Sequence, residues 1–170
     1  FGTRVEKFQE LQEAVASYCL NASEKIRSES LIAKSITVSV RTSPFQNRGV
    51  YYSNNKTIDF PIATNNSIEI VKTALIALNE IFINGYRYQK ASITLTGLIS
   101  SDGNKNLFSS TKEEKINTLM RSIDNTNYKY GRSTISLASA GVDKKWNMKR
   151  DHSSKIDTAD FHSLPIIKAI

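Results

Sequence analysis

Cysteine and histidine are almost absent from this chain of 170 residues, which has one cysteine and two histidines. Because a disulfide needs two thiols, Cys19 cannot form one within the chain, and a cysteine metal site is excluded as well. We therefore expect an intracellular protein. His152 and His162 lack the cysteines or carboxylate motif that would complete a metal site, so surface or turn roles are expected for both.

Long apolar runs are also missing, since none approaches the roughly 18 residues that cross a bilayer. No secretory signal opens the chain, and we predict a cytoplasmic protein without a membrane partner. The 16 acidic residues are scattered, and no nucleophile, base and orienting group share a recognisable spacing. Two-metal phosphoryl chemistry would need clustered carboxylates. The sequence therefore predicts no catalytic site in this chain.

The most informative pattern lies in residues 33–41 and 88–96, where apolar positions alternate with hydroxyls and cations. Side chains on a strand alternate faces, and an antiparallel sheet with one buried and one solvated face has this pattern. The polar positions are Ser35, Thr37, Ser39, Arg41, Lys90, Ser92, Thr94 and Thr96. They are almost free of acids in a chain of net charge +7, which suits contact with phosphates. A merely solvated sheet face explains the pattern equally well.

Apolar residues recur at steps of three and four over 8–27 and again over 67–82, which predicts two amphipathic helices. Ser67 is the expected N-cap of the second helix. Short strands are expected at 2–6 before the first helix and at 57–62 before the second. The order strand, helix, strand, strand, helix, strand is a duplicated split βαβ arrangement. It predicts an α+β fold with a four-stranded antiparallel sheet, two helices on one face and the polar positions on the other.

The chain divides into three predicted parts, which are a sheet domain over 1–98, a linker over 99–111 and a small α/β extension over 112–170. In the extension we expect a helix over 112–123, a turn near Gly131 and an alternating stretch over 133–137. Two apolar residues, Leu107 and Phe108, interrupt the polar linker. They fit a peptide that binds a partner's groove, or they fold back onto the chain's own core.

Several blocks of residues resemble the UmuC-like family, which are bacterial Y-family translesion DNA polymerases. The blocks are Phe1 to Val5, Val40 to Phe45, Asn84 to Ala91, Met120 to Asp124, Gly131 to Arg132 and Trp146 to Arg150. The resemblance implies that 1–98 is the little finger domain, which lays its sheet on duplex primer-template DNA and holds the backbone. It also implies that the catalytic palm and its Mg²⁺ lie upstream, so this chain has no catalytic residues and no cofactor of its own.

The resemblance further implies a peptide for the β sliding clamp after the little finger. The family peptide begins with Gln and ends in Leu-Phe. Here Leu107 and Phe108 are kept, whereas Asn104 stands for the Gln and Lys105 for an apolar residue, so we expect weak clamp binding. In this family the tail contacts the UmuD′ subunit and RecA filaments, and both partners are inherited expectations.

The leading prediction is a DNA-binding region of an error-prone translesion polymerase that acts in DNA repair and SOS mutagenesis. It would grip the primer-template backbone and be tethered to the clamp. The predicted DNA-binding residues are Arg4, Ser35, Thr37, Ser39, Arg41, Lys90, Ser92, Thr94 and Thr96, and the predicted clamp-binding residues are Asn104, Leu107 and Phe108.

Two alternatives belong to other classes of protein. Leu107, Phe108 and the aperiodic tail favour a protein-interaction module without direct DNA binding. A single-strand RNA binder has the same order of strands and helices but stacks bases on aromatic side chains of its central strands. The central strands here offer hydroxyls, as at Thr37 and Thr94, so this interpretation ranks last.

Overall fold

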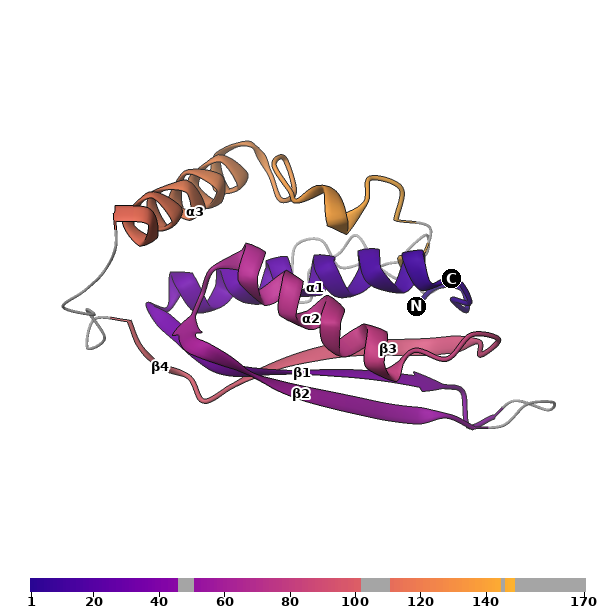
Figure 1. Cartoon of the computed structure of the whole chain (residues 1–170). Coiled ribbons are helices and arrows are strands. Elements are labelled where there is room, and N and C mark those ends of the chain that lie inside the picture. The colour runs from indigo at the N-terminus through magenta and orange to yellow at the C-terminus, as the bar shows by residue number, and fades with distance from the viewer. Residues whose placement is uncertain (46–50, 102–110, 145, 149–170) are drawn as a thin grey trace, which may run out of the picture.

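The computed structural model describes residues 1–45, 51–101, 111–144 and 146–148. In chain order the elements are α1 (Phe8–Ser28), β1 (Leu31–Thr42), β2 (Ser53–Thr64), α2 (Ser67–Ile81), β3 (Tyr88–Thr96), β4 (Ile99–Ser100), α3 (Thr111–Tyr130) and the 3-10 helix η1 (Ala138–Ala140). Helices α1 and α2 lie side by side on one face of the sheet, and α3 lies beyond them on the side away from the sheet (Figure 1). The fold is α+β, as predicted.

The sheet is antiparallel with the order β2-β1-β3, so β1 is the central strand. At its middle, Val38 lies opposite Lys56 of β2 and Ile93 of β3. The short β4 continues the pairing to the start of β1, where Ile32 lies opposite Ile99. Because directly opposed residues share a face of the sheet, this register assigns the strand side chains to the two faces.

The strand predicted over residues 2–6 does not form. Only Val5 pairs, in a single bridge to Tyr88 with N–H···O distances of 2.9 and 2.8 Å. Gly2 instead donates its backbone N–H to the carbonyl of Trp146 at 3.1 Å. A contact with a distant segment thus replaces strand pairing, and β4 is the fourth strand of the sheet.

The core lies between the sheet and the helices α1 and α2, and it follows the predicted spacing of apolar residues. Among its fully buried side chains are Leu11, Val15, Cys19, Ile36, Val38, Val40, Ile70, Leu78 and Tyr88. Burial disfavours the ionised thiol and raises the pKa of Cys19 to about 12. Burial also raises the pKa of Tyr88, although a hydrogen bond with the backbone of Ile83 opposes the shift.

Helix α1 is covered on a second side, away from the sheet, by residues that follow α3. The hydroxyl of Ser17 donates to the carbonyl of Ala140 at 3.4 Å. The ring of Tyr18 meets Trp146 edge-on, with ring centroids 5.7 Å apart, and Trp146 is only 4% exposed. The first helix is therefore packed between the sheet and the described residues that follow α3, which we call the C-terminal segment.

Helix α2 begins one residue away from the predicted cap. The side chain of Asn66, not of Ser67, accepts a hydrogen bond from the backbone N–H of Ile68 at 3.0 Å. Asn66 adopts the extended backbone of an N-cap. Ser67 is already helical, and its buried hydroxyl lies 2.7 Å from the hydroxyl of Ser23 on α1. The residue predicted as a cap therefore joins the two helices.

The extension differs from the prediction in two places. Helix α3 continues past the expected end at Ile123 to Tyr130, and Gly131 follows it with a φ of 109°. The alternating stretch over 133–137 is not a strand. Instead, the side chain of Asn127 accepts from the N–H of Ile135 at 2.8 Å and donates to its carbonyl at 2.9 Å. This pair of hydrogen bonds folds the segment back onto α3.

Candidate nucleic-acid interface

The face of the sheet that points away from α1 and α2 carries polar side chains of three strands, and no other described element covers it (Figure 1). We call it the open face. The register assigns to it Ser35, Thr37, Ser39 and Arg41 of β1, Ser53, Asn55, Thr57 and Asp59 of β2, and Lys90, Ser92, Thr94 and Thr96 of β3. The predicted positions of β1 and β3 are thus brought together on one surface. The β2 positions were not singled out from the sequence, although the opposite register of Ile58 and Phe60 was the signal for them.

Two cations face each other at one end of the open face. Arg41 of β1 lies directly opposite Lys90 of β3 and, on its other side, Ser53 of β2. Both cations are exposed. The ion pairs within the described ranges, which join Arg27 to Asp124, Lys56 to Glu80 and Arg87 to Glu6, involve neither of them. Directly opposed like charges destabilise a sheet, and an anion bound between them would offset that cost.

Hydroxyl groups line the open face from its middle to the end away from the cations, and they bond to one another across strands. The hydroxyls of Ser35 and Thr96 lie 2.6 Å apart, and those of Thr37 and Thr57 lie 2.8 Å apart. In each pair one hydroxyl donates and the other accepts. The accepting hydroxyl keeps its own hydrogen, which remains available to an outside acceptor such as a phosphate oxygen.

One acid lies on the open face, at the end opposite the cations. Asp59 of β2 faces Ser35, which lies six residues before Arg41 on the same strand. At about 3.3 Å per residue the two ends are roughly 20 Å apart. The face therefore has a cationic end, a hydroxyl middle and an acidic end.

Arg4 lies outside the sheet but close to its cationic end. It is exposed and precedes Val5, whose bridge to Tyr88 fixes this part of the chain beside the start of β3. Lys90 follows two residues after Tyr88. The structure thus brings the third predicted cation to the same end of the molecule as Arg41 and Lys90.

A cluster of aromatic rings supports the cationic end from the core side. Tyr52 packs against Tyr86 with ring centroids 4.9 Å apart and meets Tyr88 edge-on at 6.2 Å. The cluster extends to Phe82, 5.7 Å from Tyr88, and to Phe8, 4.7 Å from Phe82. Such packing holds the strand ends and their loops in one arrangement.

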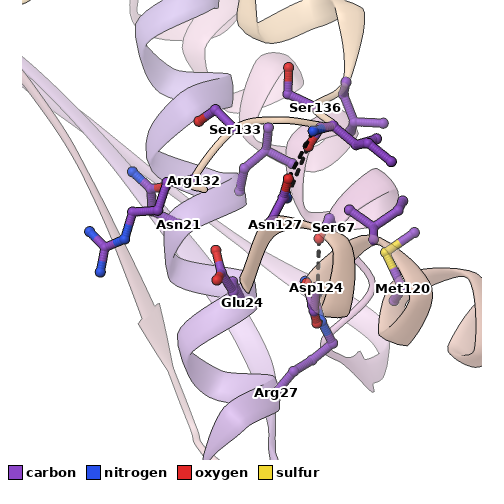
Figure 2. Close-up of a pocket in the computed structure, with 14 residues that line it drawn as sticks. Asn21, Glu24, Arg27, Ser67, Met120, Asp124, Asn127, Arg132, Ser133 and Ser136 are labelled. Carbon is purple, nitrogen blue, oxygen red and sulfur yellow. Dashed lines mark hydrogen bonds and ion pairs between the residues drawn. The ribbon is translucent and has the colours of Figure 1, made fainter. Parts of the chain in front are cut away.

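A second feature is a cavity of about 130 Å³ between α1, α3 and the segment after α3. Figure 2 shows its lining, in which most of the labelled side chains are polar and Met120 is apolar. The lining residues are Leu20, Asn21, Glu24, Arg27, Ser67, Met120, Ile123, Asp124, Asn127, Arg132, Ser133, Ile135, Ser136 and Leu137. It belongs to the junction between the sheet domain and the extension and lies away from the open face.

Arg27 lies at one end of this cavity and bonds through all three of its nitrogens. Nε and Nη2 donate to the two carboxylate oxygens of Asp124, both at 2.7 Å. Nη1 donates to the carbonyl of Asn65 at 2.6 Å and to the hydroxyl of Ser67 at 2.8 Å. Sequence reasoning missed this contact, because no local pattern pairs an arginine on one helix with an acid far along the chain.

The clamp-peptide residues Asn104, Leu107 and Phe108 lie outside the described residues. Across the described ranges no three His, Cys, Asp or Glu side chains gather as metal ligands. No helix in the same ranges is both long enough and apolar enough to cross a membrane.

The antiparallel sheet, the helices on one side of it and the uncovered polar face define an α+β domain with one sheet face open to a ligand. Residues 1–107 match the impB/mucB/samB family C-terminal domain, and the chain belongs to that family. Residues 117–167 match a domain of unknown function, DUF4113. The boundary between the two matches falls at the start of α3.

Relatives of known name match nearly all of the chain. Protein UmuC of Salmonella typhimurium is 34% identical over 99% of this chain and 40% of its own length. Protein MucB of Salmonella typhimurium and Protein MucB of Escherichia coli are each 33% identical over 98% of this chain and 39% of their own length. The predicted UmuC-like relationship is confirmed, and the chain spans about two fifths of these relatives.

Proposed function

We propose that this chain is the DNA-holding C-terminal region of an error-prone translesion DNA polymerase, and that its open face grips the backbone of duplex primer-template DNA. Membership of the impB/mucB/samB family and the similarity to UmuC and MucB support this proposal. Polymerase activity, with its palm and Mg²⁺, would belong to the rest of the longer protein. The cellular role would be translesion synthesis in DNA repair and SOS mutagenesis, in the cytoplasm.

The observation that carries the proposal is the direct opposition of Arg41 and Lys90 on an uncovered sheet face. Two adjacent cations without an acid beside them are unfavourable in the free protein and favourable against phosphates, where they release counterions. The neighbouring hydroxyls would donate to phosphate oxygens. Such contacts position a protein on DNA without reading its sequence.

A salt titration of duplex DNA binding tests the grip. We expect the logarithm of the binding constant to fall linearly with the logarithm of salt concentration, and Arg41→Ala and Lys90→Ala each to reduce the slope by about one. Lys72→Ala is the matched control, because Lys72 is an exposed cation of α2 on the helical side of the sheet. Binding that ignores salt, or slopes that change equally for all three variants, would contradict the assignment of the open face.

We also propose that the linker tethers the chain to the β sliding clamp through Asn104, Leu107 and Phe108, and that UmuD′ and RecA are further partners. Support for these contacts is the family resemblance alone. A clamp-binding titration with Leu107→Ala and Phe108→Ala tests the tether, with loss of clamp binding and unchanged DNA affinity as the expected result. Unchanged clamp binding by both variants would exclude this peptide. Clamp binding without any duplex binding by the wild type would favour the alternative, a protein-interaction module.

A further inference from the structure

Two aromatic side chains lie exposed on either side of the connection between β1 and β2. Phe45 is 88% exposed and Tyr51 is 53% exposed. An aromatic ring left in water forgoes the stabilisation that burial gives, and Phe45 contributes almost nothing to the core. The two rings are therefore accessible to a ligand.

The backbone that carries these rings is held in place. The N–H of Thr42 donates to the carbonyl of Tyr52 at 2.9 Å, and the N–H of Tyr52 donates to the hydroxyl of Thr42 at 2.9 Å. The N–H of Phe45 donates to the hydroxyl of the buried Ser43 at 3.2 Å. Tyr52 itself belongs to the aromatic cluster and donates its hydroxyl to the carbonyl of Ile81 at 2.7 Å. Phe45 and Tyr51 thus follow and precede a pair of residues, Thr42 and Tyr52, whose hydrogen bonds hold the two strand ends together.

The rings lie at the cationic end of the open face. Phe45 follows Arg41 by four residues, and Tyr51 precedes Ser53, the partner of Arg41, by two. A chain extends by no more than about 3.6 Å per residue, so the backbone of Phe45 lies within roughly 14 Å of Arg41 and that of Tyr51 within roughly 7 Å of Ser53. That reach covers a few nucleotides of a strand whose phosphates contact Arg41 and Lys90. Exposed rings beside cations are the combination that binds single-stranded nucleic acid.

We propose that Phe45, assisted by Tyr51, stacks on unpaired bases of single-stranded DNA where the strand leaves the duplex held by the open face. The inference rests on the proposed function and adds a second part to its substrate, a single-stranded overhang next to the duplex. Stacking uses the flat face that every base has, so it tolerates any sequence. Bases inside a duplex are already stacked and offer no free face, which directs the ring to the unpaired strand.

The experiment compares three DNA probes at one salt concentration with the 170-residue chain. The first is a blunt duplex, the second is the same duplex with a 5′ overhang of thymidines, and the third has an overhang of abasic sites of equal length. We expect the wild type to prefer the thymidine overhang over the other two probes. Phe45→Ala should weaken binding of that probe by between about fivefold and a hundredfold and leave the blunt duplex unchanged, whereas Phe45→Trp should restore it.

Tyr128→Ala is the matched control, because Tyr128 is a 93% exposed ring of α3 beyond the helical layer. It should bind all three probes like the wild type. Equal losses on the blunt and overhang probes, or equal affinity for thymidine and abasic overhangs, would overturn the stacking role. So would a Phe45→Ala variant that binds every probe normally, and the exposed ring would then be assigned to a protein partner.

Failure of the grip and failure of the stacking role are distinguishable. The grip is read from the salt slope on the blunt duplex with Arg41→Ala, whereas stacking is read from the difference between thymidine and abasic overhangs with Phe45→Ala. If Arg41→Ala left the slope unchanged while Phe45→Ala removed the overhang preference, the grip would be wrong and the stacking role would stand.

Discussion

Arg27 and Asp124 form a two-pronged ion pair across α1 and α3, with both N–H···O distances at 2.7 Å. The arginine side chain is 11% exposed and the aspartate side chain 25%. A planar guanidinium matches a carboxylate in this geometry. This pair fastens the extension to the sheet domain together with Trp146, whose ring packs against Tyr18 of α1.

Removing one partner of this pair should destabilise the chain. We expect Arg27→Ala to lower the free energy of unfolding by about 3 kcal/mol, because Asp124 and the hydroxyl of Ser67 then lose their donor. The free energy of unfolding of Arg27→Lys should lie between those of the wild type and Arg27→Ala, since a lysine cannot donate to both carboxylate oxygens in the same plane. Urea unfolding followed by circular dichroism measures these changes.

The matched control is the ion pair of Arg87 and Glu6, which has a similar distance of 2.7 Å but side chains that are both 57% exposed. We expect Arg87→Ala to cost less than about 1 kcal/mol. If the two alanine variants were equally stable, the Arg27 contact would not hold the extension in place.

Gly2→Ala should displace the C-terminal segment from α1. A Cβ at this position would clash with the carbonyl oxygen of Asn147, which is backbone and cannot rotate away. The neighbouring Trp146 is the only tryptophan of the chain, so its fluorescence reports the displacement directly. We expect a red-shifted emission for Gly2→Ala and the wild-type spectrum for Thr3→Ala, which changes an exposed residue. An unshifted spectrum for Gly2→Ala would show that this contact is dispensable.

Cys19 should be unreactive until the chain unfolds. Burial raises the pKa of its thiol from 9.0 to about 12, and only the thiolate attacks thiol reagents. At about pH 8, where an ordinary thiol is partly ionised, we expect a disulfide reagent to label the native chain only at the rate of unfolding. Immediate stoichiometric labelling would contradict the burial of this thiol.

The same shift predicts a loss of stability in alkali. The pKa of Cys19 is higher in the folded chain than in the unfolded chain. Its contribution to the free energy of unfolding is therefore complete below pH 9.0 and is lost as the pH rises toward about 12. The slope is about 1.4 kcal/mol per pH unit. Cys19→Ala should lack this pH-dependent loss. Comparing the free energy of unfolding of the two chains across that range therefore separates the effect of Cys19 from the effect of tyrosine ionisation. Parallel pH profiles would contradict the prediction.

Tyr88→Phe should destabilise the cationic end of the sheet. The hydroxyl of the fully buried Tyr88 accepts from the N–H of Ile83 at 2.8 Å and donates to its carbonyl at 3.0 Å. Removing the hydroxyl leaves both backbone groups without their partner, and we expect a loss of about 2 kcal/mol in unfolding free energy. Tyr86→Phe, in the same aromatic cluster, should stay within about 0.5 kcal/mol of the wild type. Equal effects of the two changes would show that the two hydrogen bonds of the Tyr88 hydroxyl add no stability of their own.

Local periodicity predicted α1, α2 and the faces of the strands well. The alternation over 88–96 coincides with β3, and the spacing over 8–27 differs from α1 by one residue at its end. These features depend on a repeat of about two or 3.6 residues that a neighbouring element does not alter. Arg41 and Lys90 could thus be assigned to the same face before their strands were known to be adjacent.

Features that depend on a distant partner could not be predicted in this way. The strand expected over 2–6 is reduced to one bridge, because Gly2 bonds to Trp146 instead. Asn66 rather than Ser67 caps α2, and both residue types suit a cap equally. The hydroxyl of Ser67 bonds to Ser23 and Arg27, and only the packing of α1 against α2 makes those partners available.

The sequence by itself determined the alternating strands, the two amphipathic helices and the basic, acid-poor character of one sheet face, because these properties follow from residue types at short spacing. Tertiary structure alone decided that Arg41 lies directly opposite Lys90, that Asp59 lies at the far end of the same face, and that Arg27 receives Asp124. The physical reason is that strand register and helix docking are chosen by the total packing and pairing of segments far apart in the chain. No local repeat records that choice.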